Sequence, residues 1–350
     1  MNNTTSSPVV ESEPEILVFE HFYERQIFAA IVITVFILGT IGNSFVIVAV
    51  GLSKKLRTTT NVFVVNLAVA DLLTCFVLPW QAVAVLGGDD WPIPRAPWVC
   101  TATAFVILVT IGCSMNNLAL IAVNRWVGIT KSRFTTRRIY TARKLALMVI
   151  FSWAIPLVCG LTPVMTDFGE LGFEKLYKSC TWLLSNPYTR THSLVTAGIY
   201  YPTQLIVITV SYISIFNYVR KTSQETMIST QGNEATRIRI FKRQLDVTKN
   251  LVLVVLAFII CFTPRFVSFI ISPKWIYKFE IWSATILFSN SSVNPIIYAT
   301  SHPDFKQLIG HLIRYRQTPQ DDPSQRIRAA EYTISASTNQ ECQEHEDHRM

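Results

Sequence analysis

Charged residues are scarce in this sequence, and the usual components of catalytic and metal sites are absent from it. Asp, Glu, Lys and Arg together make up only 15% of the 350 residues. The seven cysteines form no Cys-x-x-Cys pair, and the six histidines lie outside the long apolar segments. We therefore expect neither a zinc site nor acid–base catalysis within those segments, and the chain is not expected to be an enzyme.

Long apolar runs dominate the sequence instead. Half of the residues are hydrophobic and the mean hydropathy is +0.33. About 20 consecutive apolar residues suffice to cross a bilayer core. The net charge of +8 comes from short basic segments between the runs, as the positive-inside rule explains, so no nucleic-acid partner is expected. The pattern predicts an all-α membrane protein with seven spans, at about 27–50, 61–86, 100–130, 145–164, 194–218, 251–271 and 281–299.

The distribution of basic residues also predicts the orientation. The loops richest in lysine and arginine follow spans one, three and five, so we expect a multi-pass protein of the plasma membrane with its N-terminus outside and its C-terminus in the cytoplasm. Residues 1–25 then form an extracellular tail in which Asn2 and Asn3 match the glycosylation pattern. The transmembrane bundle occupies 26–301. A short amphipathic helix, 302–315, is expected to lie on inner-leaflet lipid, and 316–350 is expected to be a disordered tail.

Asp71 is the only acidic residue inside a predicted span. A charge at the centre of a membrane helix costs roughly 2.5 to 3.5 kcal/mol, so this carboxylate needs partners. A carboxylate among hydroxyls and amides can bind a sodium ion or accept a proton. The same groups can equally serve only as hydrogen bonds between helices, and the residue types alone do not decide between these readings. The polar residues available in other spans are Asn43, Ser114, Asn290, Ser291 and Asn294.

Six short motifs follow one another in order on spans one, two, three, four, six and seven. They are Gly42-Asn43, Asn66 to Asp71, Asn124-Arg125-Trp126, Trp153, Cys261-Phe262-Thr263-Pro264 and Asn294-Pro295-Ile296-Ile297-Tyr298. In this order the motifs resemble those of class A, rhodopsin-like, G-protein-coupled receptors. Within that class, the triplet ending span three and the motif ending span seven are similar to those of melatonin receptors and of the invertebrate moody and trapped-in-endoderm orphan receptors.

The resemblance implies a receptor with a seven-helix bundle, an extracellular ligand, a heterotrimeric G protein, and arrestin and receptor kinases as further partners. It implies a disulfide between Cys100 and Cys180. It also implies a pocket for an allosteric sodium ion, bound through Asp71 and Ser114, and no other cofactor; the pocket residues are Asn43, Asp71, Ser114, Asn290, Ser291 and Asn294. The residues that it implies for activation and G-protein coupling are Asn124, Arg125, Trp126, Tyr212, Phe262, Pro264, Asn294, Pro295 and Tyr298.

Several residues depart from the family pattern. Asn124 stands where the family usually has an acid next to Arg125, and Gln244 replaces a second acid that often holds this arginine in the inactive state. Because a charge-assisted hydrogen bond is replaced by a neutral one, we expect a weak inactive lock and measurable basal signalling. Trp126 and Phe262 replace a tyrosine and a tryptophan, respectively.

The outer halves of the spans suggest what the ligand is not. Ile107 occupies the position at which amine receptors place an aspartate, so an aminergic ligand is not expected. Arg265 is a cation in the outer half of span six, where it can receive an anionic or strongly polar acceptor group. The same cavity is expected to include Thr110, Ile111, Tyr200 and Tyr201.

Two alternatives stay open. Arg265 can instead extend toward the membrane surface or pair with a carboxylate such as Glu170, Glu174 or Glu280. An ion-coupled secondary transporter is the main alternative function, since an intramembrane carboxylate suits ion coupling; against it stand the odd number of spans and the absence of an internal repeat.

Overall fold

The computed structural model describes residues 18–229, 253, 255–271 and 277–301. Four predictions lie outside these residues: glycosylation at Asn2 and Asn3, the role of Gln244, the helix 302–315 and the tail 316–350.

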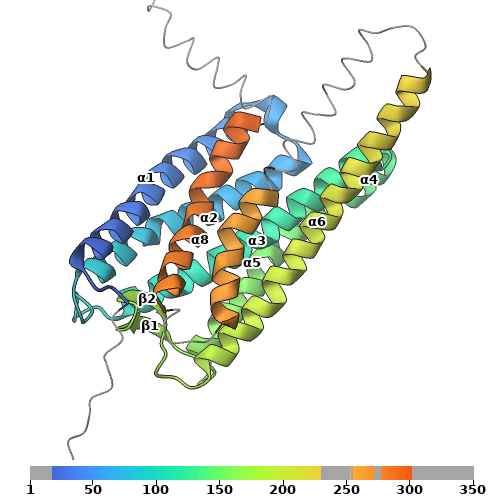
Figure 1. Cartoon of the computed structure of the whole chain (residues 1–350). Helices are drawn as coiled ribbons and strands as arrows, with labels where there is room; N and C mark the ends of the chain where they lie inside the picture. The colour runs from blue at the N-terminus through green and yellow to red at the C-terminus, as the bar shows by residue number, and fades with distance from the viewer. Residues whose placement is uncertain (1–17, 230–252, 254, 272–276, 302–350) are drawn as a thin grey trace, which may run out of the picture. The chain divides into compact units, whose positions relative to one another are not determined.

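The described residues form a helical bundle with one β-hairpin near one end (Figure 1). The predicted spans correspond, in order, to α1 (Phe22–Leu52), α2 (Thr59–Leu86), α3 (Trp98–Thr130), α5 (Ala142–Met165), α6 (Thr189–Ser229), the helix Val255–Ile270 and α8 (Tyr277–Ser301). Two short helices, η1 (Lys54–Leu56) and α4 (Arg133–Ile139), lie between spans. The strands are β1 (Leu171–Glu174) and β2 (Ser179–Trp182).

Among the described residues, five helices are long and apolar enough to cross a membrane: α1, α2, α3, α5 and α6. The helix Val255–Ile270 is a shorter apolar helix. In α8 many side chains are polar, and Ser283, Thr285, Asn290, Ser291 and Asn294 are all buried. This helix therefore packs a polar face into the bundle. These polar residues lower its mean hydropathy, although the helix is part of the bundle.

One helix keeps its predicted course through a proline, and another extends beyond its predicted end. The second span was predicted at about 61–86, and α2 continues through Pro79 to Leu86. A proline inside a helix removes one backbone hydrogen bond without necessarily ending the helix, because neighbouring helices support the freed groups. The fifth span was predicted to end near residue 218, whereas α6 extends to Ser229. Its added turns carry Arg220 and Lys221, two of the basic residues that the hydropathy pattern assigns to a loop.

The segment between α5 and α6 contains a hairpin that the apolar pattern does not predict. Strands β1 and β2 pair antiparallel, with Phe173 opposite Cys180. Cys180 forms a disulfide with Cys100 at the start of α3, with the two Cα atoms 5.0 Å apart. The disulfide therefore attaches this hairpin to the third span.

Helices α1 and α8 approach closely because α1 has glycines at the contact. A Cβ atom added to Gly42 would lie 2.7 Å from Cβ and 3.0 Å from Cγ of Pro295. The approach allows Asn43 to donate a hydrogen bond to the carbonyl of Ser291, at 2.8 Å. A small residue in α1 thus brings α8, with its polar face, into register with the rest of the bundle.

This contact predicts the effect of filling it. Gly42→Ala should lower the unfolding temperature of the detergent-purified protein and cost about 1–3 kcal/mol, because the rigid ring of Pro295 cannot move aside as a flexible side chain would. Gly51→Ala is the matched control in the same helix, since nothing lies within 4 Å of the added Cβ. Equal unfolding temperatures for the two variants would contradict the proposed contact.

Candidate functional site

A cavity of about 180 Å³ lies beneath the hairpin and between the helices. Its walls are largely apolar, with Phe28 of α1, Ile107 and Ile111 of α3, and Phe288 of α8 among the lining residues. Its cover includes Leu171, Tyr177 and the strand Ser179–Trp182. Such a concave, mostly apolar space with few polar groups is the usual form of a small-molecule site.

The cover is held in place by α2 as well as by the disulfide. Gln81, which is buried, donates from Nε2 to the carbonyl of Cys180 at 2.7 Å and accepts from its backbone N–H at 3.0 Å. Both backbone groups of Cys180 are thus satisfied by one side chain. The hairpin is consequently fixed to both α2 and α3 over the cavity.

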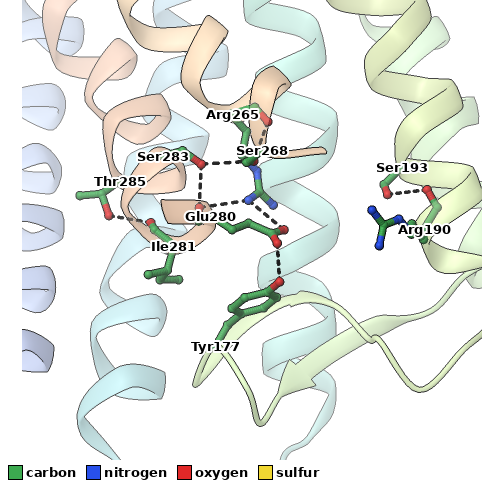
Figure 2. A network of polar contacts seen from close by, with 9 residues as sticks. All are labelled: Tyr177, Arg190, Ser193, Arg265, Ser268, Glu280, Ile281, Ser283 and Thr285. Atoms are coloured by element: carbon green, nitrogen blue, oxygen red, sulfur yellow. Dashed lines mark hydrogen bonds and ion pairs between the residues drawn. The ribbon is translucent and has the colours of Figure 1, made fainter. Parts of the chain in front are cut away.

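The charged residues of the cavity form one cluster (Figure 2). Nη1 of Arg265 donates to Oε1 and to the backbone carbonyl of Glu280, each at 3.1 Å. The hydroxyl of Tyr177 donates to the other carboxylate oxygen of Glu280. Arg265 also lies over the ring of Phe269, with Cζ 4.4 Å from the ring centroid. The cluster therefore joins the hairpin, the helix Val255–Ile270 and α8.

A second polar cluster surrounds Asp71, whose side chain is fully buried. Oδ1 accepts hydrogen bonds from the hydroxyls of Ser114, at 2.9 Å, and Ser291, at 3.1 Å. Oδ2 accepts from Nδ2 of Asn294 at 2.8 Å. No lysine or arginine pairs with this carboxylate among the residues that the structure describes. Asp71 therefore joins α2, α3 and α8 through neutral donors alone.

The donor set around Asp71 fits a small hard cation. A carboxylate, the two serine hydroxyls and the side-chain carbonyl of Asn294 offer oxygen ligands, which such cations prefer. No described cationic residue pairs with the carboxylate, so a bound cation would balance a buried charge. The residues present are thus compatible with a sodium ion held by Asp71 and Ser114. Asn43 reaches the cluster only through the backbone of Ser291, and Asn290 is buried without a hydrogen bond to Asp71.

The inner end of α3 holds Asn124 and Arg125. Asn124 is buried and accepts a hydrogen bond from Thr60 of α2 at 2.5 Å. Arg125 lies close enough to Tyr212 and Tyr298 to interact electrostatically with both. Its Nε atom is buried and has no hydrogen-bond partner, and no carboxylate pairs with it within the described ranges. Within the described ranges, the arginine therefore interacts with two tyrosines and pairs with no acid.

Aromatic rings connect α6 with the floor of the cavity. Phe262, a lining residue, stacks on Phe258 with centroids 4.7 Å apart, and Phe258 stacks on Tyr201 at 5.8 Å. The hydroxyls of Tyr201 and Thr263 lie 2.5 Å apart. A change in the cavity that moves Phe262 must therefore also move this stack, which lies just before Pro264.

The comparison with known families decides the class. The profile of the 7 transmembrane receptor (rhodopsin family) matches residues 42–298. The chain belongs to this family. The rhodopsin family consists of signalling receptors, so the chain is a multi-pass membrane receptor and neither an enzyme nor a transporter.

Individual relatives of this receptor carry names with different ligands. The chain is 26% identical over 287 residues to the allatostatin-A receptor of Bombyx mori, covering 77% of this chain and 74% of the relative. It is 26% identical over 308 residues to protein trapped in endoderm-1 of Drosophila melanogaster, covering 81% and 76%. It is 29% identical over 289 residues to the GQ-coupled rhodopsin of Mizuhopecten yessoensis, covering 78% of this chain but only 56% of the rhodopsin. The likeness to melatonin receptors stays a prediction.

The fold also matches a solved receptor. The crystal structure of squid rhodopsin superposes with a TM-score of 0.71 at 19% identity, covering 91% of this chain and 94% of the rhodopsin chain. The predicted seven-helix bundle is therefore confirmed, as is the disulfide between Cys100 and Cys180.

One predicted cavity residue is placed elsewhere. Ile107, Ile111, Tyr200, Tyr201 and Arg265 all line the cavity of the receptor, but Thr110 does not. Thr110 is buried against α2, where its hydroxyl accepts from Thr74 at 2.8 Å and donates to the carbonyl of Val106. A threonine one residue away from a cavity-facing isoleucine points to the neighbouring helix, because successive helical positions are rotated by about 100°.

Other residues were not singled out by sequence reasoning. Nothing in the sequence marks Gln81 or Tyr177 as a functional residue, since neither position matches a motif. Asn117 and Ser152 extend the family motif on α2: Asn66 donates to Asn117 at 2.8 Å and to Ser152 at 3.0 Å, and Trp153 donates to Asn66 at 2.8 Å. The sequence feature that could have predicted this network is the presence of polar residues within apolar runs.

Proposed function

We propose that this receptor lies in the plasma membrane with its N-terminus outside, binds an extracellular ligand in the cavity beneath the hairpin, and activates a heterotrimeric G protein at its cytoplasmic end. The observation that supports the proposal most directly is that α3 and α6 carry both regions. Both helices contribute residues to the cavity. At the inner end of the bundle, α3 carries Arg125 and α6 carries Tyr212, and these two residues interact electrostatically. A ligand that shifts these helices would therefore change the surroundings of Arg125.

Activation in this proposal is a change between two helix arrangements. Pro264 and Pro295 each remove a backbone hydrogen bond and so permit bending of the helix Val255–Ile270 and of α8. Opening of the inner ends would free Arg125 from Tyr212 and Tyr298, with Asn124, Trp126, Phe262 and Asn294 adjusting around it. Arrestin and receptor kinases are proposed partners of the cytoplasmic tail, and lipid of the helix 302–315; both segments lie outside the described residues.

The proposed ligand is not an amine. Ile107 lines the cavity where a carboxylate would be needed to bind a protonated amine. The acid that does line the cavity, Glu280, is already engaged by Arg265 and Tyr177. A cationic ligand would have to displace a buried arginine from its carboxylate, which is costly for the arginine left behind.

Removal of the Arg125 side chain should abolish coupling. We expect nucleotide exchange on one G-protein subtype in membranes with the wild type, and a loss of at least about tenfold with Arg125→Ala, because the cation that contacts the G protein is gone. Arg95→Ala, which removes an exposed arginine at the other end of the bundle, is the control at matched surface density. Exchange by Arg125→Ala equal to that of the control would refute the proposed role.

The weak inactive lock should appear as basal activity. Wild-type membranes without ligand should show more exchange than mock membranes, and Asn124→Asp should lower it several-fold, because the new carboxylate can form a charge-assisted bond with Arg125. Asn124→Leu, which adds no charge, should not lower it. Wild-type exchange no higher than that of mock membranes at matched surface density would contradict this prediction.

Sodium should favour the inactive state. Replacing choline chloride by sodium chloride at constant ionic strength should lower wild-type basal exchange, because the ion would hold α2, α3 and α8 together through Asp71. Asp71→Asn, which keeps the shape but removes the charge, should abolish the sodium effect. Asp167→Asn removes an exposed acid and should retain it. A sodium response in Asp71→Asn equal to that of the wild type would rule out this site.

A further inference from the structure

The charges of the described residues that line the cavity add up to zero. Arg265 and Glu280 are the only Asp, Glu, Lys or Arg residues among the described residues that line it. Their side chains retain only 14% and 17% of their exposure, and their closest N–O distance is 3.1 Å. The pair is thus largely withdrawn from water, where an additional charge is costly because solvent screens it poorly.

Each carboxylate oxygen of Glu280 already has a partner. Oε1 accepts from Arg265, and Oε2 accepts from the hydroxyl of Tyr177 (Figure 2). The carboxylate is consequently held from two sides, by the hairpin and by the helix Val255–Ile270. It presents a fixed negative charge next to any group that binds Arg265.

Arg265 has N–H donors that no described residue uses. A guanidinium group has five N–H donors, and the two hydrogen bonds that Arg265 donates to other described residues both come from Nη1. No described residue accepts a hydrogen bond from Nε or Nη2, and these are the donors that a ligand in the cavity would engage in this proposal. Since the ring of Phe269 covers one face of the guanidinium, its planar edge is the part that can bind an acceptor.

From this arrangement we propose that the cavity takes an uncharged, largely apolar ligand that ends in a hydrogen-bond acceptor such as an amide or ester carbonyl, which binds the free edge of Arg265. An anionic ligand would place its charge beside the carboxylate of Glu280, and a cationic ligand would meet the guanidinium. A neutral acceptor satisfies the remaining donors and leaves the charge of the cavity unchanged. This inference rests on the proposed function, because it assumes that the cavity is the ligand site.

Three probes with the same apolar chain separate the possibilities: octanamide, octanoate and octylammonium. Their binding to the purified, full-length receptor is measured as the concentration-dependent rise in unfolding temperature, which requires no G protein. For the wild type we expect octanamide to bind at least about tenfold more tightly than either charged probe, a difference of about 1.4 kcal/mol.

Two variants should change the preference in opposite directions. Glu280→Gln leaves Arg265 without its counter-ion and should make octanoate the preferred probe. Arg265→Gln leaves Glu280 unbalanced and should make octylammonium the preferred probe. Glu170→Gln makes the same chemical change as Glu280→Gln at an exposed residue outside the cavity lining, and should keep the preference for octanamide. Because two single variants are compared by the order of three probes, a general loss of stability cannot imitate the expected result.

The outcomes are distinct from those of the coupling experiment. If the wild type binds octanoate as tightly as octanamide, binds none of the three probes, or shows an order that Glu280→Gln leaves unchanged, the inference is wrong. Nucleotide exchange that depends on Arg125 would then still support the proposed function. If the order of probes reverses as expected but no G protein responds, the ligand class stands and the proposed coupling fails.

Discussion

A carboxylate with no exposed surface, and with no basic partner in the part of the chain that the structure describes, constrains the bundle. Asp71 can be buried only if neutral donors surround it, and these come from Ser114 of α3 and from Ser291 and Asn294 of α8. An unpaired buried charge would cost several kcal/mol, so the register of α2, α3 and α8 is fixed by a few hydrogen bonds. Through the backbone of Ser291, Asn43 adds α1 to the same arrangement.

The outer cluster depends on a different balance. Arg265 and Glu280 neutralise one another directly, and Tyr177 joins them to a hairpin that is itself attached to α2 and α3. The two clusters are therefore complementary in kind. The outer cluster is an ion pair whose arginine has N–H donors that no described residue uses, so a hydrogen-bond acceptor suits it. The inner cluster is a single carboxylate with remaining acceptor capacity, so a cation suits it.

The sequence was sufficient to predict the helical bundle and to predict that Asp71 needs polar partners, because both follow from the cost of polar groups in lipid. It could not choose the partner of Arg265 among three acids. Glu280 pairs with it, whereas the carboxylate of Glu174 accepts from the backbone N–H groups of Leu176 and Leu184, and Glu170 is exposed. That choice depends on how α8 packs beside the helix Val255–Ile270. The orientation of Thr110 and the four-residue strands of the hairpin likewise depend on tertiary contacts, which no local pattern contains.

The departures from the family motif become intelligible together with these clusters. In the described residues, Asp71 is a buried anion without a basic partner and Arg125 is a cation without an acidic one, although both belong to the same bundle. Asn124, in place of an acid, accepts a hydrogen bond from Thr60, and Arg125 interacts electrostatically with Tyr212 and Tyr298. Neither charge thus has a permanent counter-ion among the described residues of the bundle, which favours reversible partners: a sodium ion for Asp71 and a G protein for Arg125 in the proposed function. A permanent ion pair at either position would stabilise one helix arrangement, whereas a receptor that switches needs two arrangements of similar free energy.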